Sequence, residues 1–319
     1  MNTKSTVSTI NLGISSCLVG EKVRFDSGHK RNSFIMNVLA SHFNLMPFCP
    51  EMEIGLGTPR EAIRLVNVED DIRCVGTRTK SLDVTDKLTS CANQQKHWHK
   101  DLCGYILKKD SPSCGMERVK LYKGEIPERT GVGLYAAQLM KNFPHLPVEE
   151  EGRLGDAIIR ENFIQRVFVY ARWKVLCREN LSWKSITDFH ANHKYIYMSH
   201  NPKMAKELGK WLAGNNKIHI ETLKESYLEM MMKLLKIKAS RKNHVNTLQH
   251  IQGYLKTKID ANDKEELNEV VEQYRLGLLP LIVPITLLRH HFRKFPHHYI
   301  ESSFYMRPHP SELMLLNNL

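Results

Sequence analysis

The distribution of apolar and polar residues divides the chain into two halves with different periodicities. In the first 150 residues, short strand-like runs alternate with longer runs whose apolar positions lie three and four apart. The strand-like runs are INLGISS, LMPFC and GYILKK, and the helical runs are NSFIMNVLASHF, DVTDKLTSCANQQKHWH and GVGLYAAQLMKNF. This alternation predicts an α/β domain built on a mostly parallel, Rossmann-like sheet.

The second half has helical spacing throughout. Turn-forming segments such as NPK, AGNN and DANDK separate the helical runs. The segment PHLPVEEEGRLGD, residues 144–156, combines prolines, glycines and a run of glutamates, so we place the domain junction there. The pattern therefore predicts an α/β domain over residues 1–150 and an all-α domain over residues 156–319.

The most apolar stretch of the chain is LGLLPLIVPITLL, residues 276–288. It is too short to span a bilayer and contains Pro280 and Pro284, so we interpret it as a buried, kinked helix. The first residues, MNTKSTVSTINLGISSC, lack the uninterrupted apolar run of a secretory signal. We therefore expect a cytoplasmic protein that does not associate with membranes.

The net charge of +12 is concentrated in the second half. Residues 156–319 carry 25 Lys and Arg against 16 Asp and Glu, whereas residues 1–155 carry 21 against 18. A basic excess in one domain is typical of a polyanion-binding protein, and nucleic acid is the leading candidate partner. A basic surface without a specific partner explains the composition equally well.

Two basic segments of the second half also contain aromatic residues, ASRKNHVNTLQHIQGYLKTK and RHHFRKFPHHY. Lys and Arg contact phosphates, and aromatic rings stack on exposed bases, so these segments are candidate RNA-binding elements. The alternative is a solvated helix face with a few core aromatics. The candidate RNA contacts are Arg241, Lys242, His250, Tyr254, Lys256, Lys258, Arg289 and Arg293.

Three of the seven cysteines share one sequence context. Cys17, Cys49 and Cys114 each end or closely follow a strand-like run. The carboxyl ends of parallel strands meet at one edge of a sheet, so these thiols could converge. A disulfide framework is not expected in a reducing compartment, and the C-x-x-C pairs of a structural zinc site are absent. A metal cluster and plain core packing both remain open.

Two polar residues accompany these cysteines. Glu51 lies two residues after Cys49, and Ser111 precedes Cys114 by three residues across a proline turn. A carboxylate beside the thiols could activate water, and a hydroxyl could donate to a developing charge. Alternatively, Glu51 is a first-turn acid after Pro50, and Ser111 is a cap or turn residue.

The remaining cysteines and two histidines need no catalytic role. We expect Cys74, Cys91, Cys103 and Cys177 to be packing residues, with Cys91 and Cys103 the alternatives for any fourth ligand. His97 and His99, in KHWHK, are two residues apart and could ligate a metal, but we expect them at the surface of a basic helix end.

Blocks SSCLVGEKVRFDSGHK, FCPEMEIGLGTPRE, DVTDKL and ILKKDSPSCGMERV together resemble the TudS-like thiouracil desulfidases over the first 150 residues. The resemblance implies a 4Fe-4S cluster held by Cys17, Cys49 and Cys114, with one open iron, and catalytic roles for Glu51 and Ser111. The GLGTPR loop departs from the family pattern at Gly57.

The second half is similar to the YbgA-like domain in its SRKNHVNTLQHIQGYLK, YRLGLLPLIVPITLLRHHF and RPHPSELMLLNN blocks. The tandem resembles the RudS proteins, which remove sulfur from 4-thiouridine in tRNA. It implies a hydrolytic conversion of C=S to C=O with release of hydrosulfide, with tRNA as partner and no obligatory protein partner. The alternatives are a desulfidase of free thiouracil or thionucleosides, and a non-catalytic, cluster-bearing RNA-binding protein.

Overall fold

The computed structural model describes residues 10–79, 81–124, 126–179, 181–313 and 315–317. The chain divides into two compact units, with the division between Asp156 and Ala157. The segment expected to be a junction contributes instead to the first unit, because residues 148–150 form a strand of its sheet. Each unit is described by itself below.

The first unit contains a four-stranded parallel sheet in the order β2-β1-β5-β8. The two central strands, β1 and β5, are buried along almost their whole length, as expected for a sheet covered on both faces. The strands of this sheet are β1 (Asn11–Ser15), β2 (Asn44–Phe48), β5 (Gly104–Leu107) and β8 (Val148–Glu150). The predicted α/β class and parallel sheet are therefore confirmed.

A second sheet, in the order β4-β3-β6-β7, is mixed. Two antiparallel hairpins, β3/β4 and β6/β7, are joined by parallel pairing of β3 with β6. Its strands are β3 (Ile63–Val68), β4 (Asp71–Gly76), β6 (Val119–Lys123) and β7 (Ile126–Gly131). The sequence analysis did not predict this sheet.

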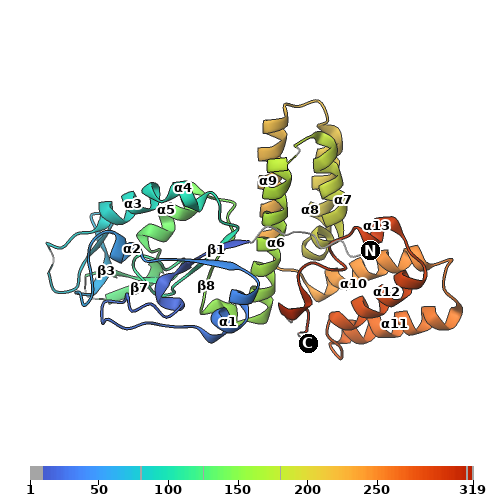
Figure 1. The fold of residues 1–319 in the computed structure, drawn as a ribbon, viewed down its shortest axis with the longest axis horizontal. Coiled ribbons are helices and arrows are strands. Elements are labelled where there is room, and N and C mark those ends of the chain that lie inside the picture. The colour runs from blue at the N-terminus through green and yellow to red at the C-terminus, as the bar shows by residue number, and fades with distance from the viewer. Residues whose placement is uncertain (1–9, 80, 125, 180, 314, 318–319) are drawn as a thin grey trace. The chain divides into compact units, whose positions relative to one another are not determined.

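Short helices connect these strands. Helix α3 packs against both α2 and α5, and Figure 1 shows α3, α4 and α5 grouped together on this unit. The helices are α1 (Ser33–Asn37), α2 (Pro50–Glu53), α3 (Thr85–Gln94), α4 (Lys96–His99) and α5 (Leu134–Asn142), with 3-10 turns at Ser16–Leu18, Leu39–Ser41 and Arg153–Gly155.

The second unit is helical in all its described elements, as predicted (Figure 1). Helix α7 packs against α8, α9 and α10, while α11 packs between α10 and α12. The helices are α6 (Ala157–Glu179), α7 (Trp183–His200), α8 (Pro202–Gly214), α9 (Ile220–Lys236), α10 (Arg241–Gln252), α11 (Ala261–Leu276), α12 (Ile282–Lys294) and α13 (His298–Glu301), with 3-10 turns at Gly253–Leu255 and Ser311–Leu313.

The prediction of one kinked helix over residues 276–288 is wrong. Helix α11 ends at Leu276, and Gly277 follows in the left-handed conformation with φ of 83°. Such a residue terminates a helix because its amide bonds back to the last turn, and Pro280 then begins a new segment that leads into α12. Within the described residues, no helix is long and apolar enough to cross a membrane.

Candidate active site

The three predicted cysteines lie at the carboxyl ends of three adjacent strands. Cys17 follows β1, Cys49 follows β2 and caps the start of α2, and Cys114 lies in the turn after β5. Because β2, β1 and β5 are parallel neighbours, their chains leave the sheet at the same edge. All three cysteines line one pocket of about 390 Å³, together with Glu51 and Ser111. The fold therefore brings together the three cysteines, the glutamate and the serine that the sequence analysis predicted to form one site.

The thiols surround the pocket at a wider spacing than a single ion would set. Zinc–sulfur bonds of about 2.3 Å would place the sulfurs of one tetrahedral zinc about 3.8 Å apart. Among the described residues, three His, Cys, Asp or Glu side chains whose ligand atoms lie within 4.8 Å of one another occur in the second unit. The three thiols of the pocket do not lie that close together. Their arrangement suits a larger group better than one zinc ion.

Burial keeps these thiols protonated in the metal-free protein. Burial, as the largest cause, and the neighbouring Cys49 together raise the pKa of Cys17 to about 11, although Lys108 opposes the shift. Burial likewise raises the pKa of Cys49 and of Cys114. Thiols become thiolates when they ligate a metal, since the cation supplies the missing charge stabilisation. The buried thiols of Cys17 and Cys114 and the half-buried thiol of Cys49, around one pocket, therefore fit a thiolate-bound metal cluster.

Glu51 and the serine turn are joined by hydrogen bonds. The Ser113 hydroxyl donates to Glu51 Oε1 at 2.6 Å, and the Ser111 and Ser113 hydroxyl oxygens are 2.9 Å apart. Ser111 Oγ also accepts from the backbone N–H of Cys114 at 3.1 Å. Ser111 faces the pocket, whereas the fully buried Ser113 links it to Glu51. The sequence analysis identified Ser111 and missed Ser113.

Arg60 fixes the other oxygen of Glu51. Its Nε and Nη2 donate to Glu51 Oε2 at 3.0 and 2.6 Å, and the Arg60 side chain is only 6% exposed. The same guanidinium donates to the carbonyls of Val23 and Gly57. Arg60 therefore fixes both the Glu51 carboxylate and the GLGTPR loop. That loop contains Gly57, the position at which the sequence departs from the family pattern. The place of Arg60 directly after Pro59, nine residues from Glu51, did not distinguish it from a surface residue in the sequence.

The turn that carries Ser111 and Cys114 is held against the start of α5. The backbone N–H of Gly133 donates to Gly115 O at 2.8 Å, and the N–H of Ala136 donates to Ser113 O at 3.1 Å. A Cβ on Gly133 would lie 2.6 Å from the Ser113 carbonyl carbon. The close backbone approach therefore requires glycine at position 133 and fixes the turn against the start of α5.

Cations and one exposed ring surround the pocket. Lys108 pairs with Glu151, and the Arg24 guanidinium lies 5.4 Å from the ring centre of Phe25, which is 41% exposed. The cationic lining residues are Arg24, Lys30, Arg60, Lys108 and Lys109. Glu51 and Asp110 also line the pocket, so the lining as a whole is net positive, which favours an anionic ligand.

The other cysteines lie outside this pocket. Cys74, Cys91 and Cys103 are buried, and the lining residues, all of which the structure describes, include none of them. Cys177 is half-buried in α6 of the second unit. The alternatives for a fourth ligand, Cys91 and Cys103, are therefore not brought to the pocket.

The surface placement predicted for both His97 and His99 holds only for His97. His99 is buried, its Nε2 lies 2.8 Å from the Tyr135 hydroxyl, and its ring packs against Trp98 and Tyr105. Burial lowers the pKa of His99 to about 4. The ring is part of the aromatic core beneath the pocket.

The predicted RNA contacts of the second unit differ in exposure. Arg241 donates to Tyr274 O, Arg289 donates to Met306 O, and Tyr254 packs against His297. These three side chains have internal partners. The exposed members of the set are Lys242, His250, Lys256, Lys258 and Arg293.

Comparison with known proteins defines the class of the first unit. Residues 12–151 match the sequence model of the 2-thiouracil desulfurase family, and residues 194–310 match that of a protein family of unknown function, DUF1722. The chain thus joins a TudS-like 2-thiouracil desulfurase domain, homologous to a family of enzymes, to a DUF1722 domain. The resemblance drawn from the sequence is confirmed in these two parts.

The chain is also similar to two individual proteins. The chain is 24% identical over 151 residues to the uncharacterized protein YbgA of Escherichia coli strain K12, covering 47% of this chain and 89% of YbgA. It is 28% identical to the solved 4Fe-4S-dependent thiouracil desulfidase TudS, covering 46% of this chain and 94% of that one, with a TM-score of 0.39.

Proposed function

We propose that the protein is a 4Fe-4S-dependent desulfidase that converts 4-thiouridine in tRNA to uridine. The observation that carries the proposal is the convergence of Cys17, Cys49 and Cys114 on one pocket that also contains Glu51 and Ser111. The overall reaction adds water to the C=S carbon and yields C=O, hydrosulfide and a proton. It needs no external oxidant or reductant.

The three cysteines would hold the cluster as thiolates. When bound through three protein ligands, such a cluster supplies a soft iron site to which a thiocarbonyl sulfur binds better than a carbonyl oxygen does. The buried positions of Cys17 and Cys114 would keep bulk water from competing at these two ligands. This preference of a soft metal for sulfur selects thiolated over ordinary pyrimidines.

Glu51 would act as the general base. Arg60 occupies its Oε2 and Ser113 donates to its Oε1, so the carboxylate is fixed in one orientation with a lone pair of Oε1 left for water. Proton transfer from that water to Glu51 accompanies attack on the base carbon. Ser111, which faces the pocket, would turn its hydroxyl hydrogen from Ser113 toward the charge that develops there, while the Ser113 hydroxyl continues to donate to Glu51.

The entrance of the pocket is suited to a nucleotide within a polyanion. Arg24, Lys30 and Lys109 supply positive charge for flanking phosphates, and the exposed ring of Phe25 offers a face on which an extruded base can stack. The helical unit would add phosphate contacts through its exposed basic residues near the end of α10, His250, Lys256 and Lys258.

The test uses anaerobically reconstituted full-length protein and 4-thiouridine-containing tRNA, with loss of the near-ultraviolet thiouridine absorbance as readout. We expect turnover on tRNA, and we expect Cys114→Ala to abolish it. Cys177→Ala, the matched cysteine control outside the pocket, should retain it. Absence of turnover with an intact cluster spectrum would refute the enzymatic proposal and favour a non-catalytic RNA-binding protein.

The second candidate is a desulfidase of free thiouracil or thionucleosides, which the name of the matched family favours. Parallel assays with free 4-thiouracil separate the two, and a double Lys256→Glu, Lys258→Glu variant identifies the part played by the helical unit. We expect this variant to lose tRNA turnover while keeping any activity on the free base, and the tRNA turnover of the parent protein to fall as the salt concentration rises. Lys206→Glu with Lys210→Glu, on the exposed face of α8, is the charge-matched control.

A further inference from the structure

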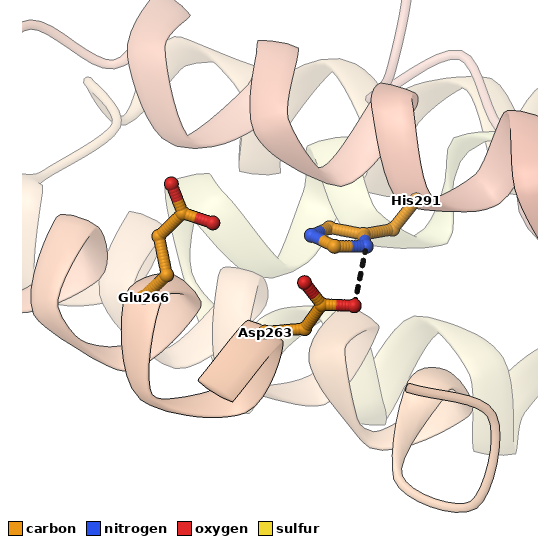
Figure 2. Close-up of side chains that lie close together, drawn as sticks. All are labelled: Asp263, Glu266 and His291. Carbon is orange, nitrogen blue, oxygen red and sulfur yellow. Dashed lines mark ion pairs between the residues drawn. The ribbon is translucent and has the colours of Figure 1, made fainter. Parts of the chain in front are cut away.

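A second group of potential metal ligands lies in the helical unit, apart from the thiol pocket. Asp263 and Glu266 are one turn apart on α11, so their side chains share a helix face, and His291 projects from the packed helix α12. Figure 2 shows both carboxylates turned toward the imidazole ring. One ligand atom from each residue lies within 4.8 Å of those of the other two.

The imidazole of His291 gives the independent indication of a ligand. Its side chain is only 2% exposed, yet neither ring nitrogen has a hydrogen-bond partner among the described residues. The nearest carboxylate oxygen, Asp263 Oδ2, is 3.9 Å from Nδ1, beyond hydrogen-bond distance. Leaving a buried polar nitrogen without a partner is unfavourable. A cation between the ring and the two carboxylates would satisfy the imidazole and neutralise the acidic pair.

We propose that Asp263, Glu266 and His291 bind a divalent first-row transition ion, either zinc or manganese. One imidazole nitrogen with two carboxylate oxygens is a donor set that such ions accept, and it differs in chemistry from the thiol pocket. Metal–ligand bonds of about 2.0–2.2 Å bring ligand atoms to within about 4.4 Å of one another, and the exposed Glu266 side chain is free to rotate to that distance. Three protein ligands leave further coordination positions to water.

The ion would connect two helices that are contiguous in sequence. Helices α11 and α12 are separated only by the turn over residues 277–281, which contains Gly277 and Pro280. Coordination by both helices fixes the angle at which α11 and α12 cross. It also raises the stability of the folded state as more of the protein binds the ion. Metal content and thermal stability are therefore linked through this site, independently of any desulfidase activity.

The experiment uses full-length, cluster-loaded protein, so that the cysteine ligands are occupied. Binding of Mn²⁺ is followed by the loss of the free-ion paramagnetic resonance signal, and binding of Zn²⁺ by equilibrium dialysis with elemental analysis. We expect one equivalent of at least one of the two ions to bind per chain and to raise the melting temperature. Asp263→Asn and His291→Gln should each weaken that binding at least tenfold. Glu265→Gln, an exposed neighbour outside the cluster, is the matched control and should bind as the parent protein does.

Asp263 is partly exposed and its Asn substitution keeps the side-chain size, so this variant tests the site even if the buried His291→Gln variant fails to fold. The proposal would be overturned if folded Asp263→Asn bound each of the two ions as tightly as the parent protein does. The absence of saturable binding of either ion to the parent protein would overturn it too.

Discussion

The Ser113 hydroxyl donates to Glu51 Oε1 across 2.6 Å and thereby joins the turn after β5 to the first turn of α2, 62 residues away in sequence. Each of these segments also carries a cysteine of the pocket, Cys49 beside Glu51 and Cys114 beside Ser113. The hydrogen bond therefore sets the position of the proposed base relative to two of the proposed cluster ligands.

Replacing Ser113 by alanine should separate positioning from cofactor binding. The change leaves Glu51 Oε1 without its buried donor and Ser111 without its hydroxyl partner. We expect kcat/KM of the Ser113→Ala variant to fall by roughly ten- to hundredfold, the effect of losing one such hydrogen bond. The variant should keep the spectrum of the cluster. Steady-state desulfidation assays with quantified iron check this. Ser41→Ala, an exposed serine of the same unit, is the control; equal activity of the two variants would argue against a positioning role.

Replacing Arg60 by methionine should destabilise the first unit. The change leaves the carboxylate of Glu51 without its cation and removes the donors to two backbone carbonyls. Breaking a buried ion pair by removal of one partner costs about 3–5 kcal/mol. Urea unfolding of the metal-free protein measures the change. Arg129→Met removes an exposed pair with Asp110 and should change the unfolding midpoint little, so a similarly small effect at Arg60 would contradict the prediction.

Gly133→Ala should disturb the serine turn. The added Cβ would lie 2.6 Å from the backbone carbonyl of Ser113, and backbone atoms cannot rotate away as a side chain can. We expect a loss of about 1–3 kcal/mol of stability and reduced incorporation of iron, measured by thermal unfolding and iron content. Gly155→Ala is the control, since no atom lies within 4 Å of its added Cβ. Normal iron incorporation in Gly133→Ala would show that the turn tolerates displacement.

The buried His99 should make the first unit sensitive to acid. Its pKa is lowered from about 6.5 to about 4 by burial, so the folded state prefers the neutral ring and the unfolded chain binds the proton more readily. The contribution of the neutral His99 ring to the free energy of unfolding is fully present above about pH 6.5. It is lost as the pH falls toward 4, and the total loss is about 3 kcal/mol. Chemical unfolding at a series of pH values tests this. In His99→Gln the slope over this interval should decrease, and an unchanged slope would assign the acid sensitivity to other groups.

The strand ends of the first sheet were predictable because each combines a short apolar run with an immediate turn. That pattern located Cys17, Cys49 and Cys114, and with them the neighbours Glu51 and Ser111. Ser113 was not distinguishable from Ser111 in the sequence, because which hydroxyl turns toward Glu51 depends on the backbone of the 111–115 turn. That conformation is set by contacts with α5, a separate element.

Arg60 was missed, and His99 was wrongly placed at the surface, for a related reason. A basic residue after a proline and a histidine in KHWHK both have the composition of surface segments. Their burial follows from tertiary packing, Arg60 against Glu51 and His99 against Tyr135. The second sheet escaped prediction because β7 is almost entirely exposed and lacks an apolar alternation. In the helical unit, Gly277 was the overlooked signal that separates α11 from α12.

The delivery of the three cysteines by three different strands has a consequence for how the cofactor would be acquired. The nascent chain offers no closely spaced pair of thiols at these positions on which a cluster could begin to form. The sheet must assemble before the ligands meet, so loading would follow folding, and iron and sulfide would have to enter through the pocket opening. Strains impaired in cluster delivery should therefore accumulate this protein folded and empty rather than degraded.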